Sequence, residues 1–120
     1  MSTRVLIVDD AKFMRSLVRG ALEGSGYEIV GEAENGIQAV EKYQIESPDA
    51  VLMDISMPEM DGLNALRAIR EMDPAARVAM LTAMGQQNVV IEAIKAGAKD
   101  FIVKPFEPDR VLKSLGKLLM

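Results

Sequence analysis

Three carboxylates, one hydroxyl and one amine come directly after apolar stretches of the chain. These side chains are the clearest candidates for chemical activity. Asp9 and Asp10 follow RVLIV, and Asp54 follows AVLM. Thr82 follows RVAML, and Lys104 follows FIV. Clustered carboxylates repel one another and favour a hard divalent cation such as Mg²⁺. A carboxylate beside a metal and a lysine is suited to accept a phosphoryl group as a nucleophile.

The chain also lacks two chemically important residue types. It contains no His and no Cys in 120 residues. This excludes His or Cys zinc sites, disulfides, thiol nucleophiles and imidazole proton transfer. Any metal must be a hard ion held by oxygen, and any phosphoryl group must come from a partner or a small phosphodonor.

Composition and charge describe an acidic globular chain. Hydrophobic residues make up 49%, and the formal net charge is −4. An acidic chain without a basic run argues against nucleic-acid binding. No apolar run approaches the roughly 20 residues of a membrane span, and the first residues lack the apolar region of a signal peptide. We therefore expect one cytoplasmic domain over residues 1–120.

Alternating strands and helices must position the polar residues. Short apolar stretches predict buried strands, and apolar residues at helical spacing predict helices. The predicted strands are residues 4–8, 28–33, 50–53, 77–81 and 101–103. The predicted helices span residues 13–22, 37–43, 63–69, 90–94 and 108–119.

This alternation predicts an α/β fold, namely a doubly wound five-stranded parallel sheet in the order 2-1-3-4-5 with five helices, as in flavodoxin-like proteins. The carboxyl ends of parallel strands meet at one edge, and ligands bind where the strand order reverses. That reversal would place Asp9, Asp10 and Asp54 side by side. With Mg²⁺ bound and Lys104 nearby, the formal charges would sum to zero.

These residues and the strings around them resemble the receiver domain of response regulators. The strings are VLIVDD, VLMDISMPEMDG and AGAKDFIVKPF. The resemblance covers the whole chain, so residues 1–120 are expected to be a single receiver domain without an output domain. It implies that Asp54 is the phosphoacceptor and that Lys104 and Thr82 contact the phosphoryl group.

The resemblance also implies a metal site, with Mg²⁺ as the cofactor. Asp10 would be a direct ligand, and Asp9 would act through water. Asp54 and the backbone carbonyl of Ser56 would complete the protein ligands.

The resemblance further implies switch residues. Thr82 would follow the phosphoryl group, and Phe101 would rotate into the space that Thr82 leaves. Phe101 stands where the family often has a tyrosine, so a partner contact that needs a hydroxyl is lost. The Lys104-Pro105 peptide bond is expected to be cis.

Residues 82–87 and AGAKDFIVKPF resemble chemotaxis regulators in particular. The implied function is a two-component response regulator, a phosphoprotein that a chemotaxis histidine kinase phosphorylates. It would not be an enzyme, although it would promote its own phosphorylation and dephosphorylation. The implied output is flagellar rotation through the motor switch protein, with a phosphatase as a further partner. We expect a monomer that binds neither nucleic acid nor membrane.

Alternatives remain for single residues and for the function. Asp10 could cap the first helix, Thr82 could cap the fourth, and Phe101 could be a core residue. The chain could serve as a phosphorelay intermediate or regulate another process. It could also be a small aspartyl-phosphate phosphohydrolase, although Ser56 stands where that class has a second aspartate. A nucleotide- or flavin-binding domain of this topology would need a Gly-rich phosphate loop, which the sequence lacks.

Overall fold

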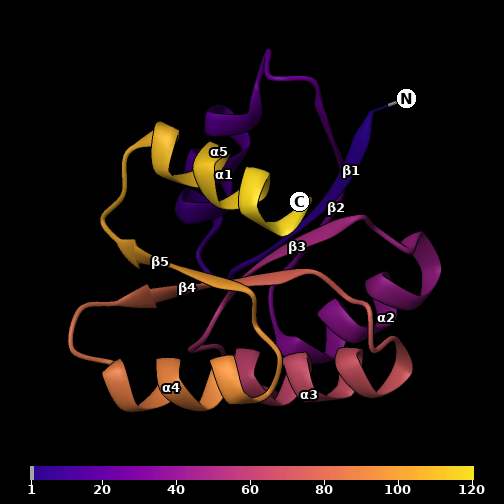
Figure 1. The fold of residues 1–120 in the computed structure, drawn as a ribbon, viewed down its shortest axis with the longest axis vertical. Coiled ribbons are helices and arrows are strands. Elements are labelled where there is room, and N and C mark those ends of the chain that lie inside the picture. The colour runs from indigo at the N-terminus through magenta and orange to yellow at the C-terminus, as the bar shows by residue number, and fades with distance from the viewer. Residues whose placement is uncertain (1) are drawn as a thin grey trace.

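One parallel sheet organises the computed structural model, which describes residues 2–120. The strand order is β2-β1-β3-β4-β5, as predicted. The strands are β1 (Thr3–Val8), β2 (Tyr27–Ala33), β3 (Ala50–Asp54), β4 (Val78–Ala83) and β5 (Asp100–Lys104). The helices are α1 (Lys12–Leu22), α2 (Gly36–Glu46), α3 (Gly62–Met72), α4 (Gln87–Lys95) and α5 (Pro108–Leu118). Helices α1 and α5 cover one face of the sheet, and α2, α3 and α4 cover the other (Figure 1).

The sheet is buried on both faces because its strands are apolar at successive positions. In β3, Leu52 packs into the layer beneath α1 and α5, and Met53 packs into the layer beneath α2, α3 and α4. Both side chains are fully buried. Continuous apolar strands are typical of parallel sheets between two helical layers. The centre of the sheet is therefore a rigid support for the polar residue that ends β3.

Three strands run further than the sequence analysis predicts. Asp54, Thr82 and Lys104 belong to β3, β4 and β5 and do not merely follow them. Backbone pairing continues through these residues, with Asp54 opposite Leu81 and Thr82 opposite Val103. A polar side chain ends an apolar pattern without ending the ladder of backbone hydrogen bonds. The sheet itself therefore holds all three polar residues.

The helices differ in how they begin. Asn35 caps α2 by accepting a hydrogen bond from the Gln38 N–H, and Asp61 caps α3 by accepting one from the Asn64 N–H. Helix α4 begins after Gln86 without a side-chain cap. Within residues 2–120, no helix is both long enough and apolar enough to cross a membrane.

Candidate functional site

Three aspartates meet at the carboxyl edge of the sheet, beside β1 and β3. Each of Asp9, Asp10 and Asp54 offers a carboxylate oxygen, and these oxygens lie within 4.8 Å of one another. Asp9 and Asp54 are buried, whereas Asp10 is exposed. The cluster forms because β1 and β3 are neighbours in the sheet despite their separation in the sequence. The predicted juxtaposition of the three aspartates is therefore confirmed.

Lys104 joins the cluster from β5, which is separated from β3 by β4. Its Nζ lies 3.0 Å from Asp9 Oδ2 and 3.3 Å from Asp54 Oδ1. The Lys104-Pro105 peptide bond that follows is cis, as predicted. Lys104 is thus an ion-pair partner of two site carboxylates and not an ordinary surface lysine.

The electrostatics of the site favour additional positive charge. Burial of Asp54 and the negative charge of Asp9 raise the pKa of the Asp54 carboxyl to about 6, although Lys104 opposes the shift. Burial lowers the pKa of Lys104, but its hydrogen bond to Asp9 and the charges of Asp54 and Asp9 outweigh burial and raise that pKa above its ordinary value. The site therefore holds three clustered carboxylates, and Lys104 is paired with two of them.

The donor set fits Mg²⁺. A hard cation prefers oxygen ligands and commonly takes one or two carboxylates together with water. The three clustered carboxylates supply only oxygen, and the exposure of Asp10 leaves one side of the cluster open to solvent. Asp9, Asp10 and Asp54 are therefore the residues that could hold the ion.

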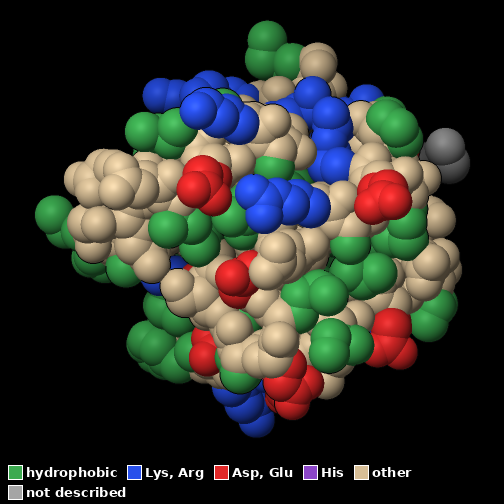
Figure 2. Space-filling model, turned by 90° about the horizontal axis from the view of Figure 1, so that it is seen from below, with side chains coloured by type: hydrophobic (Ala, Val, Ile, Leu, Met, Phe, Trp, Pro, Cys, Tyr) green, Lys and Arg blue, Asp and Glu red, His purple; other side chains and the backbone are tan. Residues whose placement is uncertain are grey.

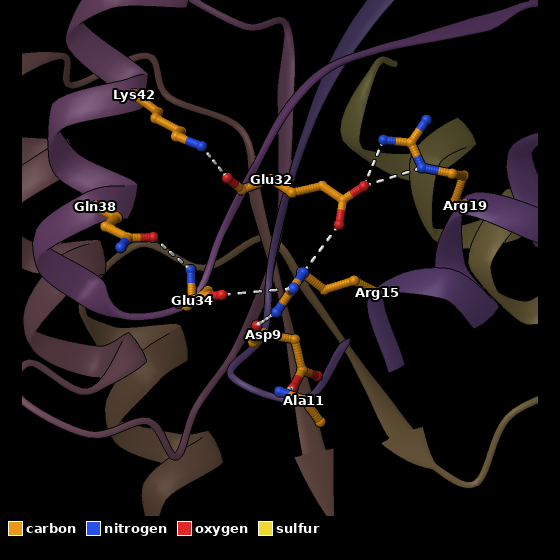
Figure 3. A network of polar contacts seen from close by, with 8 residues as sticks. All are labelled: Asp9, Ala11, Arg15, Arg19, Glu32, Glu34, Gln38 and Lys42. Atoms are coloured by element: carbon orange, nitrogen blue, oxygen red, sulfur yellow. Dashed lines mark hydrogen bonds and ion pairs between the residues drawn. The ribbon is translucent and has the colours of Figure 1, made fainter. Parts of the chain in front are cut away.

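A charged network between α1 and β2 fixes the backbone behind the aspartates (Figure 3). Arg15 donates from Nη1 to the backbone carbonyl of Asp9 at 2.8 Å and from Nε to Glu32 Oε1 at 2.9 Å. Arg19 pairs with the same carboxylate, and its hydrogen bond is the main reason that the pKa of Glu32 lies below its ordinary value. Sequence reasoning missed Arg15, because arginines on a helix usually face solvent.

Neither capping alternative matches the structure. The N-cap position of α1 is Ala11, not Asp10, and it makes no side-chain cap. Asp9 Oδ1 instead accepts a hydrogen bond from the Ala11 N–H at 2.9 Å. Thr82 lies inside β4, and α4 begins only after Gln86. The positions of Asp10 and Thr82 are therefore not explained by helix capping.

The Thr82 hydroxyl is engaged by a residue that the sequence analysis did not single out. Thr82 is 2% exposed, and its hydroxyl donates to Gln86 Oε1 at 2.8 Å. Gln86 Nε2 donates to the Ser56 hydroxyl at 3.1 Å. Gln86 thus links the loop after β4 to the loop after β3. The resemblance of residues 82–87 to chemotaxis regulators includes Gln86 but implies no role for it, because a glutamine in a polar loop has no distinctive sequence pattern.

Phe101 borders an apolar groove of about 520 Å³ beside the loop after β4 and α4. Phe101 is partly buried and packs against the core beneath α4. The groove also contains Met84, Ile91 and Ile94, whose exposed fractions are 78%, 51% and 49%. Figure 2 shows hydrophobic side chains among charged ones on the face that includes α3 and α4. Phe101 therefore has both core contacts and an adjacent space.

Comparisons with known proteins agree on one family. A family model described as the response regulator receiver domain matches residues 5–116. The chain is 60% identical over 119 residues to the chemotaxis protein CheY of Bacillus subtilis (strain 168), covering 99% of each chain. It is 58% identical over 118 residues to the chemotaxis protein CheY of Thermotoga maritima, covering 98% of each. A chain of the crystal structure of the CheX-CheY-BeF3-Mg+2 complex from Borrelia burgdorferi superposes with a TM-score of 0.93 at 38% identity, covering 98% of this chain and 89% of that one.

Proposed function

Because this chain belongs to the family of response-regulator receiver domains, we propose that it transmits a chemotaxis signal through phosphorylation of Asp54. It is a CheY-like response regulator, since chemotaxis proteins match it at 58–60% identity over nearly its whole length. The observation that most supports Asp54 is its position, buried at the end of β3 with Lys104 Nζ at 3.3 Å. A buried carboxylate paired with a lysine is a suitable phosphoryl acceptor.

In the proposed reaction, an Asp54 carboxylate oxygen attacks the phosphorus of a phosphohistidine or a small phosphodonor. A bond forms between this oxygen and phosphorus, and the bond from phosphorus to the donor breaks. Lys104 offsets negative charge on the transferred group, and Asp9 holds Lys104 in place at 3.0 Å. Mg²⁺, when held by Asp9, Asp10, Asp54 and the Ser56 carbonyl, supplies further neutralising charge at the phosphoryl oxygens.

The proposed output is a population shift. A phosphorylated Asp54 has roughly two negative charges and new acceptor oxygens. Thr82 and Lys104 turn toward these oxygens, the loop after β4 moves, and Phe101 enters the vacated space. The groove beside α4 then binds a protein partner more tightly.

The proposed partners are a chemotaxis histidine kinase and the flagellar motor switch protein. The complex of CheX with CheY from Borrelia burgdorferi supports a further partner, which we propose to be a phosphatase. The same site residues would also promote hydrolysis of the phosphoryl group. The chain would thus promote its own phosphorylation and dephosphorylation without acting as an enzyme on other substrates.

The direct test is labelling with a small phosphodonor and Mg²⁺, followed by mass spectrometry. We expect one phosphoryl group per chain on Asp54, and no label in Asp54→Asn. The control Asp109→Asn removes an exposed carboxylate at the start of α5 and should label normally. Labelling that persists in Asp54→Asn would contradict the proposal. Release of many phosphates per chain from varied substrates would favour the phosphohydrolase instead.

A further inference from the structure

We propose that Gln86 is a positioning residue whose side chain holds Thr82 in the unphosphorylated arrangement and must release it when Asp54 is phosphorylated. This inference rests on the proposed role of Asp54 as the phosphoacceptor. It goes further in assigning a new residue to the control of that site. We call the hydrogen bonds that Gln86 makes to Thr82, Ala83 and Ser56 the glutamine clasp.

The Thr82 hydroxyl can serve only one acceptor at a time. A hydroxyl has one proton to donate. The Thr82 hydroxyl directs that proton to Gln86 Oε1 at 2.8 Å or, more weakly, to the Ala83 carbonyl at 3.2 Å. A phosphoryl oxygen on Asp54 would need the same proton. A hydrogen bond from Thr82 to a phosphoryl oxygen and the bond from Thr82 to Gln86 are therefore mutually exclusive.

The orientation of the Gln86 amide is fixed by its hydrogen-bond partners. Its Oε1 also accepts a hydrogen bond from the Ala83 N–H at 2.9 Å. A backbone N–H can only donate, so the oxygen of the amide must face Ala83 and the amide nitrogen must face away. The nitrogen then donates to the Ser56 hydroxyl at 3.1 Å. Each bond fixes the direction of the others, so the three bonds of the clasp form a consistent set.

The glutamine clasp lies at the turn between β4 and α4. Gly85 has a φ of +89°, a conformation that glycine adopts readily, and it turns the chain just before Gln86. Gln86 occupies the N-cap position of α4, yet its side chain makes no cap and points back to the clasp. A change at Thr82 therefore acts directly on the N-cap residue of α4. The clasp supplies a physical link from Asp54 to the groove.

The expected consequence is a change in the activation equilibrium. Of the three bonds of the clasp, the one from Thr82 to Gln86 exists only in the unphosphorylated arrangement, and Gln86→Ala removes it. A typical net hydrogen bond corresponds to a roughly 2- to 12-fold change in an equilibrium constant. Gln86→Ala should therefore reach half-maximal conversion to the phosphorylated conformation at a phosphodonor concentration lower by about that factor.

The test uses ¹⁵N-labelled full-length chains in Mg²⁺, titrated with a small phosphodonor. The Val103 amide reports the conformation, because it lies in β5 beside the groove and outside the clasp. Wild type, Gln86→Ala and Gln86→Glu are compared. The control Asn88→Ala removes a nearby exposed amide on α4 for which the described residues give no side-chain hydrogen bond. Thermal unfolding checks that each variant folds.

We expect Gln86→Ala to respond at lower phosphodonor concentration than wild type, and Asn88→Ala to match wild type. Gln86→Glu keeps an acceptor for Thr82, so it should respond at the wild-type concentration or above. If wild type and Gln86→Ala reached half-maximal conversion at the same phosphodonor concentration, the proposed role of the clasp would be overturned and the proposed function would remain intact. An equal decrease of that concentration in Gln86→Ala and Gln86→Glu would also overturn the proposed role, because Gln86 would then act only as a structural residue. A wild type that never responds and takes no label on Asp54 would overturn both proposals.

Discussion

Helices α3 and α4 cover the same face of the sheet, and each follows a loop that starts at the candidate site, yet they are held differently. Helix α3 buries five of its eleven residues, namely Gly62, Leu63, Ala65, Leu66 and Ile69. Helix α4 buries only Ala93 among its nine. Two large apolar side chains of α4, Ile91 and Ile94, are about half exposed. Burial is the main source of helix stability in proteins, so α3 is the firmer of the two.

The loop that leads into α3 is also held more firmly than the loop that leads into α4. The loop to α3 returns to the sheet, where Gly62 N–H donates to the Ile55 carbonyl at 2.7 Å, and Asp61 caps the helix. The loop to α4 is tied mainly through the side chain of Gln86. Elements with fewer buried contacts open at lower free energy. We therefore expect a change at Asp54 to move α4 and to leave α3 in place.

The most destabilising substitution that we expect lies at the start of α3. A Cβ added to Gly62 would lie 2.0 Å from the backbone oxygen of Asp54, so the start of α3 would have to move away from β3. We expect Gly62→Ala to lower the free energy of unfolding by about 3 kcal/mol, as measured by urea denaturation. The control is Gly116→Ala in α5, where an added Cβ meets nothing within 4 Å. That variant should gain roughly 0.5–1 kcal/mol. Equal stability of the two variants would show that α3 is not anchored by this contact.

A second effect, of comparable size, concerns Asp54 at the end of β3, where the loop to α3 begins. Because the pKa of Asp54 is raised from 3.8 to about 6, the folded state binds more protons than the unfolded state between these values. Stability should therefore fall as the pH rises through this window. In metal-free buffer the loss is up to about 3 kcal/mol. Asp54→Asn should remove this pH dependence and be the more stable protein at pH 7, whereas Asp109→Asn should keep it. Denaturation curves from pH 4 to pH 7 with a chelator make the measurement.

The sequence was informative wherever local chemistry and periodicity decide the structure. Buried apolar stretches predicted the five strands and their order, and polar residues at their ends predicted the cluster of Asp9, Asp10 and Asp54. The sequence was less informative where tertiary contacts determine the position of a side chain. Arg15 and Gln86 belong to ordinary helical and loop patterns, and only tertiary packing directs them to Asp9 and Thr82. The close approach of Gly62 to Asp54 is likewise invisible before the fold is known.

The smallest effect that we expect concerns the N-cap of α3. Asp61 Oδ1 accepts from the Asn64 N–H at 2.8 Å, and losing such a cap costs about 1 kcal/mol. In Asp61→Ala, amides of the first turn of α3 should exchange with solvent about fivefold faster, while α4 should be unchanged. In wild type, amides of α4 should already exchange faster than those of α3.

Hydrogen exchange resolved by NMR reads both helices in one sample, and Asn88→Ala again serves as the control, since it changes α4 without touching a cap. If α3 and α4 exchanged equally fast in wild type, the difference in burial would not translate into a difference in local stability. The reason to expect otherwise is that α4 has no side-chain cap and buries fewer residues than α3. In the proposed mechanism, modification of Asp54 needs to move only the less restrained of these two helices, whose N-cap residue Gln86 is hydrogen-bonded to Thr82.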